Sequence, residues 1–127
     1  QEGKLLFQLR ENKPGIPYPN KWSLFGGGIK KGETPVLAVV REVKEELDLS
    51  LDENKLKVLF KKESNSYKRF VFYYKLQNEH RDFNLREGQN YEFLSLKEIL
   101  FKKNIVPSLR IFLLLYPFLK LRMKNKK

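Results

Sequence analysis

Three glutamates are spaced so that their carboxylates could hold a metal ion. Glu42, Glu45 and Glu46 stand at positions i, i+3 and i+4, and on a helix such positions share one face, with Cβ atoms about 5–6 Å apart. Carboxylates held this close repel one another and raise one another's pKa unless a cation lies among them. Mg²⁺ prefers oxygen ligands and takes a few carboxylates while also binding substrate phosphates. The spacing therefore indicates a magnesium site that also holds phosphate.

The segment that carries these glutamates has the signals of a helix. Thr34 is a good N-cap, and Pro35 suits the first helical position. Asp48 stands at the expected end, where a left-handed residue is common, and aspartate tolerates that conformation better than most residues. Apolar residues recur at helical period at Leu37, Val40, Val43 and Leu47. We therefore expect this helix to have a core side and a carboxylate side.

A glycine-rich loop leads into the helix. A strand predicted over residues 22–25 runs into Gly26–Gly28, and three successive glycines let the backbone approach a ligand or metal closely. Before that strand, residues 11–21 contain three prolines and are predicted to be a loop, which follows a first strand over residues 4–10.

The residue pattern in the rest of the chain predicts further strands and two more helices. Ser95 and Glu98 form a capping box that opens a short helix to about residue 101. Pro107 begins an apolar helix that Pro117 is expected to end or kink. Strands are expected over residues 55–62, 70–76 and 91–94. The order β-β-α-β-β-β-α-α predicts an α/β (α+β) fold with helices packed on a mixed β-sheet.

The amino-acid composition limits the classes of protein to which this chain can belong. The chain has 127 residues, 41% of them hydrophobic, so we expect one domain over residues 1–127 with a real core. The absence of cysteine excludes disulfides and zinc–thiolate sites and fits a reducing compartment, from which we expect a cytoplasmic location. A net charge of +11 attracts polyanions such as nucleotides, nucleic acid or anionic lipid, although a solvated lysine-rich surface is the simpler explanation.

The C-terminal part combines an apolar run with a basic end. Residues 111–119 are almost entirely apolar but fall well short of the roughly 20 residues that a membrane-spanning helix needs. We expect a core helix here rather than a membrane-surface segment. Residues 120–127 are strongly basic and are expected to form a loose tail.

The glutamate segment resembles the Nudix box, Gly-x5-Glu-x7-Arg-Glu-U-x-Glu-Glu-x-Gly-U, in which U is aliphatic. The match begins at Gly27 and continues through Glu33 and Arg41 to the three glutamates. Every defined position agrees except one, because Asp48 replaces the last glycine. Three further segments are similar to the family, the last of them to its MutT branch: residues 5–10, 22–27 and 86–96.

The resemblance implies an enzyme that hydrolyses the diphosphate linkage between a nucleoside diphosphate and another group, X. It implies the α-β-α Nudix sandwich with a mixed sheet, and Mg²⁺ as cofactor, with Mn²⁺ as a substitute. Arg41 would fix the glutamates by ion pairing, Glu33 would brace the loop, and Glu87 would be a base for the attacking water or a metal ligand. The implied metal ligands are Glu42, Glu45, Glu46, Glu87 and a carbonyl oxygen of Gly26 or Gly27.

The family's first strand normally precedes the segment that begins here at Gly3. Only residues 1–2 stand before it. We expect that strand to belong to a preceding segment rather than to be lacking, because an open sheet edge beside an active site invites aggregation.

The residues that select the substrate are less clearly marked than those that would do the chemistry. Aromatic and basic side chains near the box are candidates to stack on a base or to meet phosphate, although ordinary packing or a solvated surface explains each of them too. These candidates are Arg10, Trp22, Tyr67, Lys68 and Arg69. Leu109 stands where MutT uses an asparagine to read oxidised guanine, and leucine cannot supply those hydrogen bonds.

The leading hypothesis is a Mg²⁺-dependent, MutT-like nucleoside triphosphate pyrophosphohydrolase that releases a nucleoside monophosphate and pyrophosphate. Removal of pyrophosphate from RNA 5′ ends is an alternative that the charge of +11 would suit. Hydrolysis of nucleotide sugars or dinucleoside polyphosphates is another. A non-enzyme alternative is a Nudix module that senses nucleotides or binds nucleic acid. The sequence does not indicate an oligomeric state.

Overall fold

The chain forms its helices and strands in the order that the sequence predicts, with one short 3-10 helix in addition. The structure is a computed structural model that describes residues 3–77 and 83–125. The helices are α1 (Pro35–Leu47), α2 (Leu96–Leu100) and α3 (Pro107–Asn125), and the 3-10 helix η1 spans Glu53–Lys55. The strands are β1 (Leu5–Leu9), β2 (Trp22–Ser23), β3 (Lys57–Ser64), β4 (Tyr67–Tyr73) and β5 (Asn90–Leu94).

The strands form two antiparallel sheets, which corrects the expectation of a mixed sheet. β1 lies between β2 and β5, and β3 pairs with β4 in a separate hairpin. The hairpin is antiparallel because only Asn65 and Ser66 separate its strands, and a parallel crossover needs a dozen residues or more. In the described part of the chain, parallel pairing is limited to an isolated bridge between Trp22 and Ile105.

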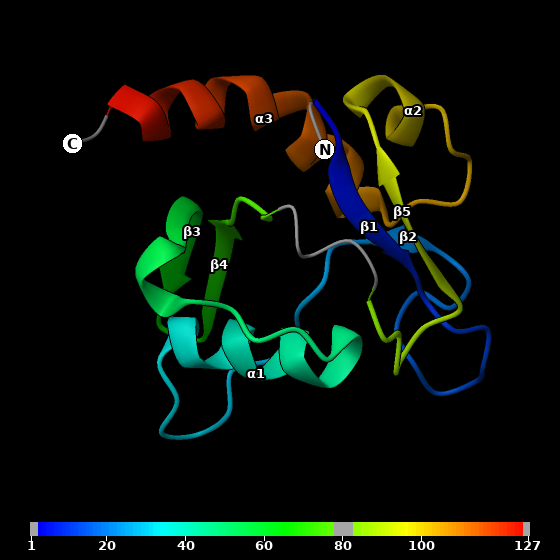
Figure 1. Ribbon diagram of the computed structural model, residues 1–127, viewed down its shortest axis with the longest axis horizontal. Coiled ribbons are helices and arrows are strands. Elements are labelled where there is room, and N and C mark those ends of the chain that lie inside the picture. Colours follow the sequence, from blue (N-terminus) through cyan, green and yellow to red (C-terminus); the bar gives the residue numbers. More distant parts are fainter. Residues whose placement is uncertain (1–2, 78–82, 126–127) are drawn as a thin grey trace.

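The sheets lie between α3 and α1, which run along the top and bottom of the molecule in Figure 1. The side chains of Phe7, Ile99 and Leu113 are fully buried in the core. Phe112 of α3 meets Phe60 of β3 edge to face, with ring centroids 6.2 Å apart. Each fully buried side chain of this size stabilises the fold by about 1.5–3 kcal/mol.

An apolar groove of about 920 Å³ runs between the two sheets. Residues 70–76 of β4 and its continuation form one wall, and Leu5 and Leu6 of β1 form part of the other. Phe112 and Leu113 of α3 also line the groove. α3 packs on β3 and also on α2, which in turn packs on β5. The helices therefore join the two sheets.

α1 has the caps that its sequence predicts. The Thr34 hydroxyl accepts a hydrogen bond from the backbone N–H of Leu37 at 3.1 Å. Asp48 is left-handed, with φ of 56°. The division of the faces differs from the prediction, because Leu37 is 45% exposed while Glu46 is buried. One of the three glutamates therefore lies on the core side of the helix.

α3 continues to Asn125, so residues 120–125 are not the loose tail that we expected. The chain stays helical through Pro117 because its second half still has partners: Met123 packs against the core, and Lys120 Nζ lies 5.3 Å from the ring centroid of Tyr73. Across the described residues, no helix has the length and apolar character needed to cross a membrane.

Candidate functional site

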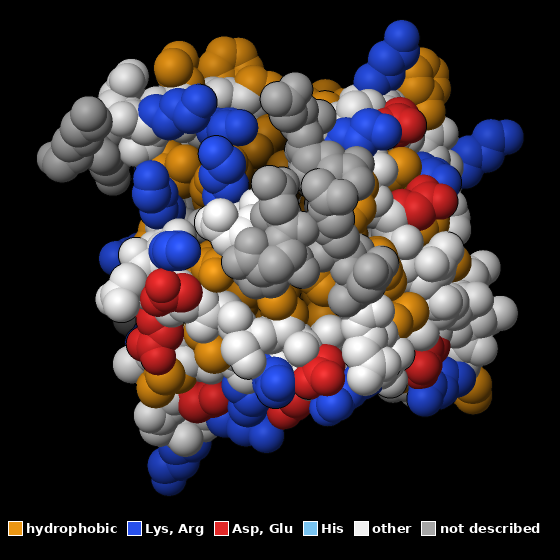
Figure 2. Space-filling model, viewed as in Figure 1, with side chains coloured by type: hydrophobic (Ala, Val, Ile, Leu, Met, Phe, Trp, Pro, Cys, Tyr) orange, Lys and Arg blue, Asp and Glu red, His pale blue; other side chains and the backbone are white. Residues whose placement is uncertain are grey.

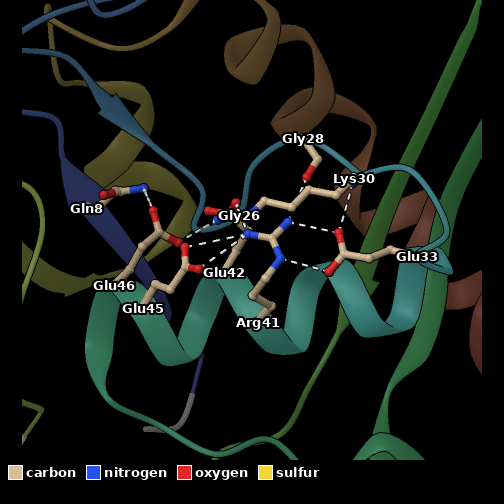
Figure 3. Close-up of polar contacts among 9 residues, drawn as sticks. All are labelled: Gln8, Gly26, Gly28, Lys30, Glu33, Arg41, Glu42, Glu45 and Glu46. Atoms are coloured by element: carbon tan, nitrogen blue, oxygen red, sulfur yellow. Dashed lines mark hydrogen bonds and ion pairs between the residues drawn. The ribbon is translucent and has the colours of Figure 1, made fainter.

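Glu46 carries a buried carboxylate that is held at both oxygens. Its Oε1 accepts a hydrogen bond from the backbone N–H of Gly26 at 2.9 Å, and its Oε2 accepts one from Gln8 Nε2 at 3.1 Å (Figure 3). The side chain is only 4% exposed. Burial raises the pKa of Glu46 to about 7, and the nearby charges of Glu42 and Glu87 add to that rise.

Arg41 ties the glycine-rich loop to α1. Its guanidinium makes two parallel contacts with Glu33, Nε to Oε2 at 2.7 Å and Nη2 to Oε1 at 2.9 Å. Nη2 also donates to the carbonyl of Gly28, and Glu33 accepts from the backbone N–H of Lys30 at 2.8 Å. The hydrogen bonds from Arg41 lower the pKa of Glu33 to about 2. Such bidentate pairs fix geometry as well as charge, so the loop is held in one place over the helix.

Glu42 lies against the loop that Arg41 holds. A Cβ atom at Gly27 would come within 2.6 Å of the Glu42 carboxyl carbon, so a side chain at position 27 would displace that carboxylate. Arg41 Nη1 donates to Glu42 at 2.7 Å. The absence of a side chain at Gly27 is therefore what lets the backbone and this carboxylate meet.

Glu45 is the most exposed of the three glutamates. Its carboxylate oxygens lie 3.5 Å from Arg41 Nη1, and its side chain is 45% exposed. Among the described residues, no three acidic or histidine side chains are gathered closely enough to enclose a metal ion by themselves. The single cluster predicted from the i, i+3, i+4 spacing is thus divided between a buried carboxylate, a half-buried one and an exposed one.

Glu87 reaches the site from a loop that is anchored at both sides. The backbone N–H of Arg86 donates to the carbonyl of Glu46 at 2.9 Å. The backbone N–H of Gln89 donates to the carbonyl of Leu9 at 2.8 Å. These bonds connect the loop to the end of α1 and to the end of β1, which brings the Glu87 side chain toward Glu46 and Glu42.

These groups line one cleft of about 420 Å³, which we call the carboxylate cleft. The loop after β1 also lines the cleft, and in this loop Arg10 Nε donates to the carbonyl of Pro17 at 2.8 Å. Tyr18 lines the cleft with a half-exposed ring and a φ of 50°. The cleft is lined by Arg10, Pro17, Tyr18, Ser23, Leu24, Gly26, Gly27, Glu42, Glu46, Glu87 and Val106.

The other residues expected to select the substrate lie elsewhere. Trp22 is 5% exposed and belongs to the core, so it cannot stack on a base, and this expectation is corrected. Lys68 and Arg69 are on β4 and do not line the carboxylate cleft. Tyr67 begins β4, and its side chain lies outside the described part of the structure. Leu109 is 4% exposed in the core, where it cannot read a base.

Gln8 belongs to the site and was missed in the sequence. It is 3% exposed, and its Nε2 donates both to Glu46 and to the carbonyl of Leu24. The available signal was a polar residue within the apolar run of a strand, which asks for a buried partner. Tyr18 also lines the cleft, and the sequence could not place it with the glutamates because a loop residue's neighbours depend on the path of the loop.

Comparison with known proteins identifies the family. The sequence matches the NUDIX domain over residues 1–116. The chain belongs to the Nudix family. Membership makes this Nudix protein a hydrolase of pyrophosphate linkages, and the family typically uses a divalent metal. No curated protein matches the chain significantly.

Solved structures with the same fold include enzymes with different substrates. A MutT protein from Methanosarcina mazei Go1 is 23% identical, with a TM-score of 0.72 over 100% of this chain and 88% of that one. A C. elegans Ap4A hydrolase is 18% identical, with a TM-score of 0.62 over 94% and 88%. A bifunctional NMN adenylyltransferase/ADP ribose pyrophosphatase from Francisella tularensis, complexed with AMP and a manganese ion, is 17% identical, with a TM-score of 0.62 over 92% and 38%. At these identities the likeness concerns the fold, and the Nudix chain's substrate must be argued from its own cleft.

The ligand type in this cleft suits a hard divalent cation, while no three acidic side chains among the described residues are gathered closely enough to enclose one as they stand. Glu42, Glu46 and Glu87 supply carboxylate oxygens to one cleft, which is the ligand type that Mg²⁺ and Mn²⁺ prefer. The raised pKa of Glu46 reflects in part the repulsion of the other two carboxylates. A cation in the cleft would relieve that repulsion.

Proposed function

We propose that this Nudix hydrolase cleaves a diphosphate linkage in a nucleoside di- or triphosphate derivative, in a Mg²⁺-dependent reaction. A nucleoside triphosphate is the leading substrate, with a nucleoside monophosphate and pyrophosphate as products. The observation that carries the proposal is the carboxylate cleft, which Glu42, Glu46 and Glu87 line together with Arg10 and Tyr18. The carboxylates suit metal-bound phosphates, and the cation and the aromatic ring suit a nucleotide.

Glu42, Glu45 and Glu46 are the proposed metal ligands, together with a carbonyl oxygen of Gly26 or Gly27. Bound Mg²⁺ would neutralise phosphate charge and lower the pKa of a bound water toward neutral pH. Among the described residues, the exposed Glu45 is held only by contacts of 3.5 Å with Arg41. We therefore expect its side chain to adjust when the site is filled, while Glu46 stays in place.

The remaining residues would orient the substrate and move a proton. Arg41 and Glu33 hold the glycine-rich loop, so that its backbone keeps a fixed distance from the carboxylates. Arg10 would meet a phosphate, and Tyr18 would stack on the base. Glu87 would accept the proton of the attacking water or add a ligand to the metal. A Glu87→Gln variant separates these roles, since loss of a base changes the pH profile whereas loss of a ligand weakens metal binding.

A panel of nucleotides incubated with the protein and Mg²⁺ tests the proposal directly. It should contain nucleoside triphosphates, nucleotide sugars and dinucleoside polyphosphates, with products separated by ion-exchange chromatography. A nucleoside monophosphate and pyrophosphate from triphosphates is the expected result. Two nucleotides, or a nucleotide and a sugar phosphate, would identify a different X. Turnover that persists after all divalent metal is removed would refute the metal-dependent mechanism.

Matched variants test the site within the same assay. Glu46→Gln should lower kcat by about 10²–10⁴-fold, a magnitude typical of losing a group that acts in proton transfer or holds charge at the reacting centre. Glu53→Gln removes an exposed carboxylate of η1 and should leave turnover unchanged. Near-normal hydrolysis by Glu46→Gln would mean that the site has been misplaced.

RNA 5′ ends are the second candidate substrate, favoured by the net charge of +11. A phosphate backbone bound by lysines and arginines gives an affinity that falls steeply with salt, whereas a single nucleotide depends on salt much less. The same assay with a 5′-triphosphorylated oligonucleotide at 50 and 200 mM salt distinguishes the two. Faster cleavage of the oligonucleotide, with strong salt dependence, would move the assignment to RNA.

A further inference from the structure

α3 exposes apolar side chains on the face opposite its core side. Ile111, Leu114, Phe118 and Leu121 are 65%, 60%, 72% and 60% exposed, respectively. They recur at i, i+3, i+7 and i+10, which places them on one stripe of the helix. Apolar side chains project along the upper edge of the molecule in Figure 2, where α3 runs in Figure 1. We call this stripe the outer face of α3.

The outer face is long and is extended by a neighbouring residue. Ten residues of helix span about 15 Å. At its N-terminal end, the guanidinium of Arg110 donates to the carbonyls of Leu100 and Lys102 at 2.9 and 3.1 Å. This holds the end of α2 beside α3, where Phe101 is 74% exposed. A helix that is apolar on both sides, with one side covered by its own domain, has a second apolar surface to bury.

The charges around the outer face indicate what covers it. α3 contains Arg110, Lys120, Arg122 and Lys124 and not one aspartate or glutamate. Two such helices facing each other would bring Arg122 and Lys124 of both copies together without compensating carboxylates on α3, so a second copy of the chain is a poor match. An anionic surface matches both features, because it accepts apolar side chains and attracts the cations.

We propose that the outer face of α3 binds the surface of an anionic lipid bilayer. Phe118, Leu114 and their neighbours enter the boundary between headgroups and acyl chains, while Arg122 and Lys124 stay with the anionic headgroups. The net charge of +11 draws the whole molecule toward the same surface. α1, which carries the glutamates of the carboxylate cleft, lies on the opposite side of the molecule from α3 (Figure 1). A protein bound through α3 therefore keeps that helix turned away from the lipid.

Co-sedimentation of the full chain with vesicles tests this proposal independently of the hydrolase activity. Vesicles of phosphatidylcholine with 30% phosphatidylserine are compared with vesicles of phosphatidylcholine alone. We expect binding to the anionic vesicles that weakens as salt is raised. No binding to the anionic vesicles at low salt would overturn the proposal.

Surface variants show whether α3 carries the binding. The double change Leu114→Gln and Phe118→Gln should weaken vesicle binding at least tenfold, because burial of each side chain contributes about a factor of ten or more. Ile111→Gln with Leu121→Gln is a second pair on the same face, in case the first pair fails to fold. Circular dichroism and the melting temperature establish that the fold is kept. Unchanged vesicle binding by a folded variant would contradict the proposal.

A charge control and an association measurement complete the test. Arg122→Ser with Lys124→Ser should weaken binding more than Lys61→Ser with Lys62→Ser, which removes the same charge from β3. Equal loss from both pairs would mean that net charge alone is responsible, and would overturn the role of α3. Sedimentation velocity that reveals a dimer abolished by the Leu114 and Phe118 changes would reassign the outer face to a second copy.

Discussion

Glu46 is a carboxylate placed where water hardly reaches it. Its only described hydrogen-bond donors are the Gly26 backbone and the Gln8 amide. Two hydrogen bonds favour the charged form, but burial opposes it and prevails, so the pKa of Glu46 rises from 4.5 to about 7. An ionised, buried Glu46 lowers the stability of the metal-free protein at neutral pH. Binding of a cation would restore that stability.

Removing the charge of Glu46 should therefore stabilise the metal-free protein above neutral pH. The folded state holds the Glu46 proton more tightly than the unfolded chain. The stabilisation of the folded state by protonated Glu46 is therefore fully present below pH 4.5 and is lost as pH rises through about 7. Relative to Glu46→Gln, the free energy of unfolding of the unmodified protein should fall by about 2–3 kcal/mol between pH 5 and 8.

Urea unfolding in the presence of a chelator measures this difference. Glu45→Gln is the control, because it removes one carboxylate from the half-exposed side of the same helix. Parallel pH curves for the unmodified protein and Glu46→Gln would show that Glu46 is solvated normally. Added Mg²⁺ should raise the melting temperature of the unmodified protein and have little effect on Glu46→Gln, since only a bound ligand stabilises the folded state.

Gln8 orients the carboxylate of Glu46 from a different strand. Methionine has a similar size and no donor, so Gln8→Met should preserve packing while releasing Glu46 Oε2. We expect Mn²⁺ affinity to fall by about 10–100-fold, as is usual when a residue that orients a metal ligand is lost. Isothermal titration with Mn²⁺ measures this, and the melting temperature without metal checks the fold. Unchanged affinity in a folded Gln8→Met protein would leave Gln8 with a packing role only.

At the scale of elements, the C-cap of α1 connects the helix to the Glu87 loop. Asp48 is left-handed, and its carboxylate pairs with Lys44 at 2.8 Å and with Arg86 at 3.1 Å. The hydrogen bond from Lys44 is the main reason that the pKa of Asp48 is lowered. Asp48, which replaces the last glycine of the Nudix box, therefore lacks glycine's conformational freedom but makes two exposed ion pairs.

Replacing Asp48 separates these two contributions. Asp48→Gly should leave the melting temperature within about 2 °C, since the easier left-handed backbone offsets the lost ion pairs. Asp48→Val should lower it by about 3–6 °C, because a β-branched residue is strained at φ of 56°. Differential scanning calorimetry decides between them. Equal melting temperatures for the glycine and valine variants would show that the backbone at residue 48 is not constrained.

At the scale of the whole molecule, an apolar groove lies between the two sheets, and residues of α3 line it. Phe112 and Leu113 of α3 line the groove together with strands from both sheets. α3 therefore has two separate surfaces, one that holds the fold together and an outer one that contributes little to it.

Paired truncations on α3 should show this division. Phe112→Ala removes a buried ring that contacts Phe60 and should destabilise the protein by about 3–5 kcal/mol. Leu114→Ala, two residues along the helix and 60% exposed, should change stability by less than about 0.5 kcal/mol. Chemical denaturation gives both values. Similar losses from the two variants would mean that the outer face is covered within the protein itself.

Features that depend on near neighbours could be predicted from the sequence. Thr34 and Asp48 cap α1, and Ser95 with Glu98 opens α2, because these bonds join residues only a few positions apart. The Nudix box also identified the family from residues within one short segment. Spacing along a helix is fixed by its geometry, so the glutamates' relation to one another could be read directly.

Which carboxylates are buried, and which groups they contact, depends on how distant segments of the chain pack. Glu46 is buried and Glu45 exposed because the glycine loop and Gln8, 38 positions away in the chain, cover one side of α1 and not the other. The burial of Trp22 in the core and the division of the strands into two antiparallel sheets also depend on contacts between distant segments. Burial and long-range hydrogen bonds depend on how distant segments pack, and the local pattern of residues carries no record of that packing.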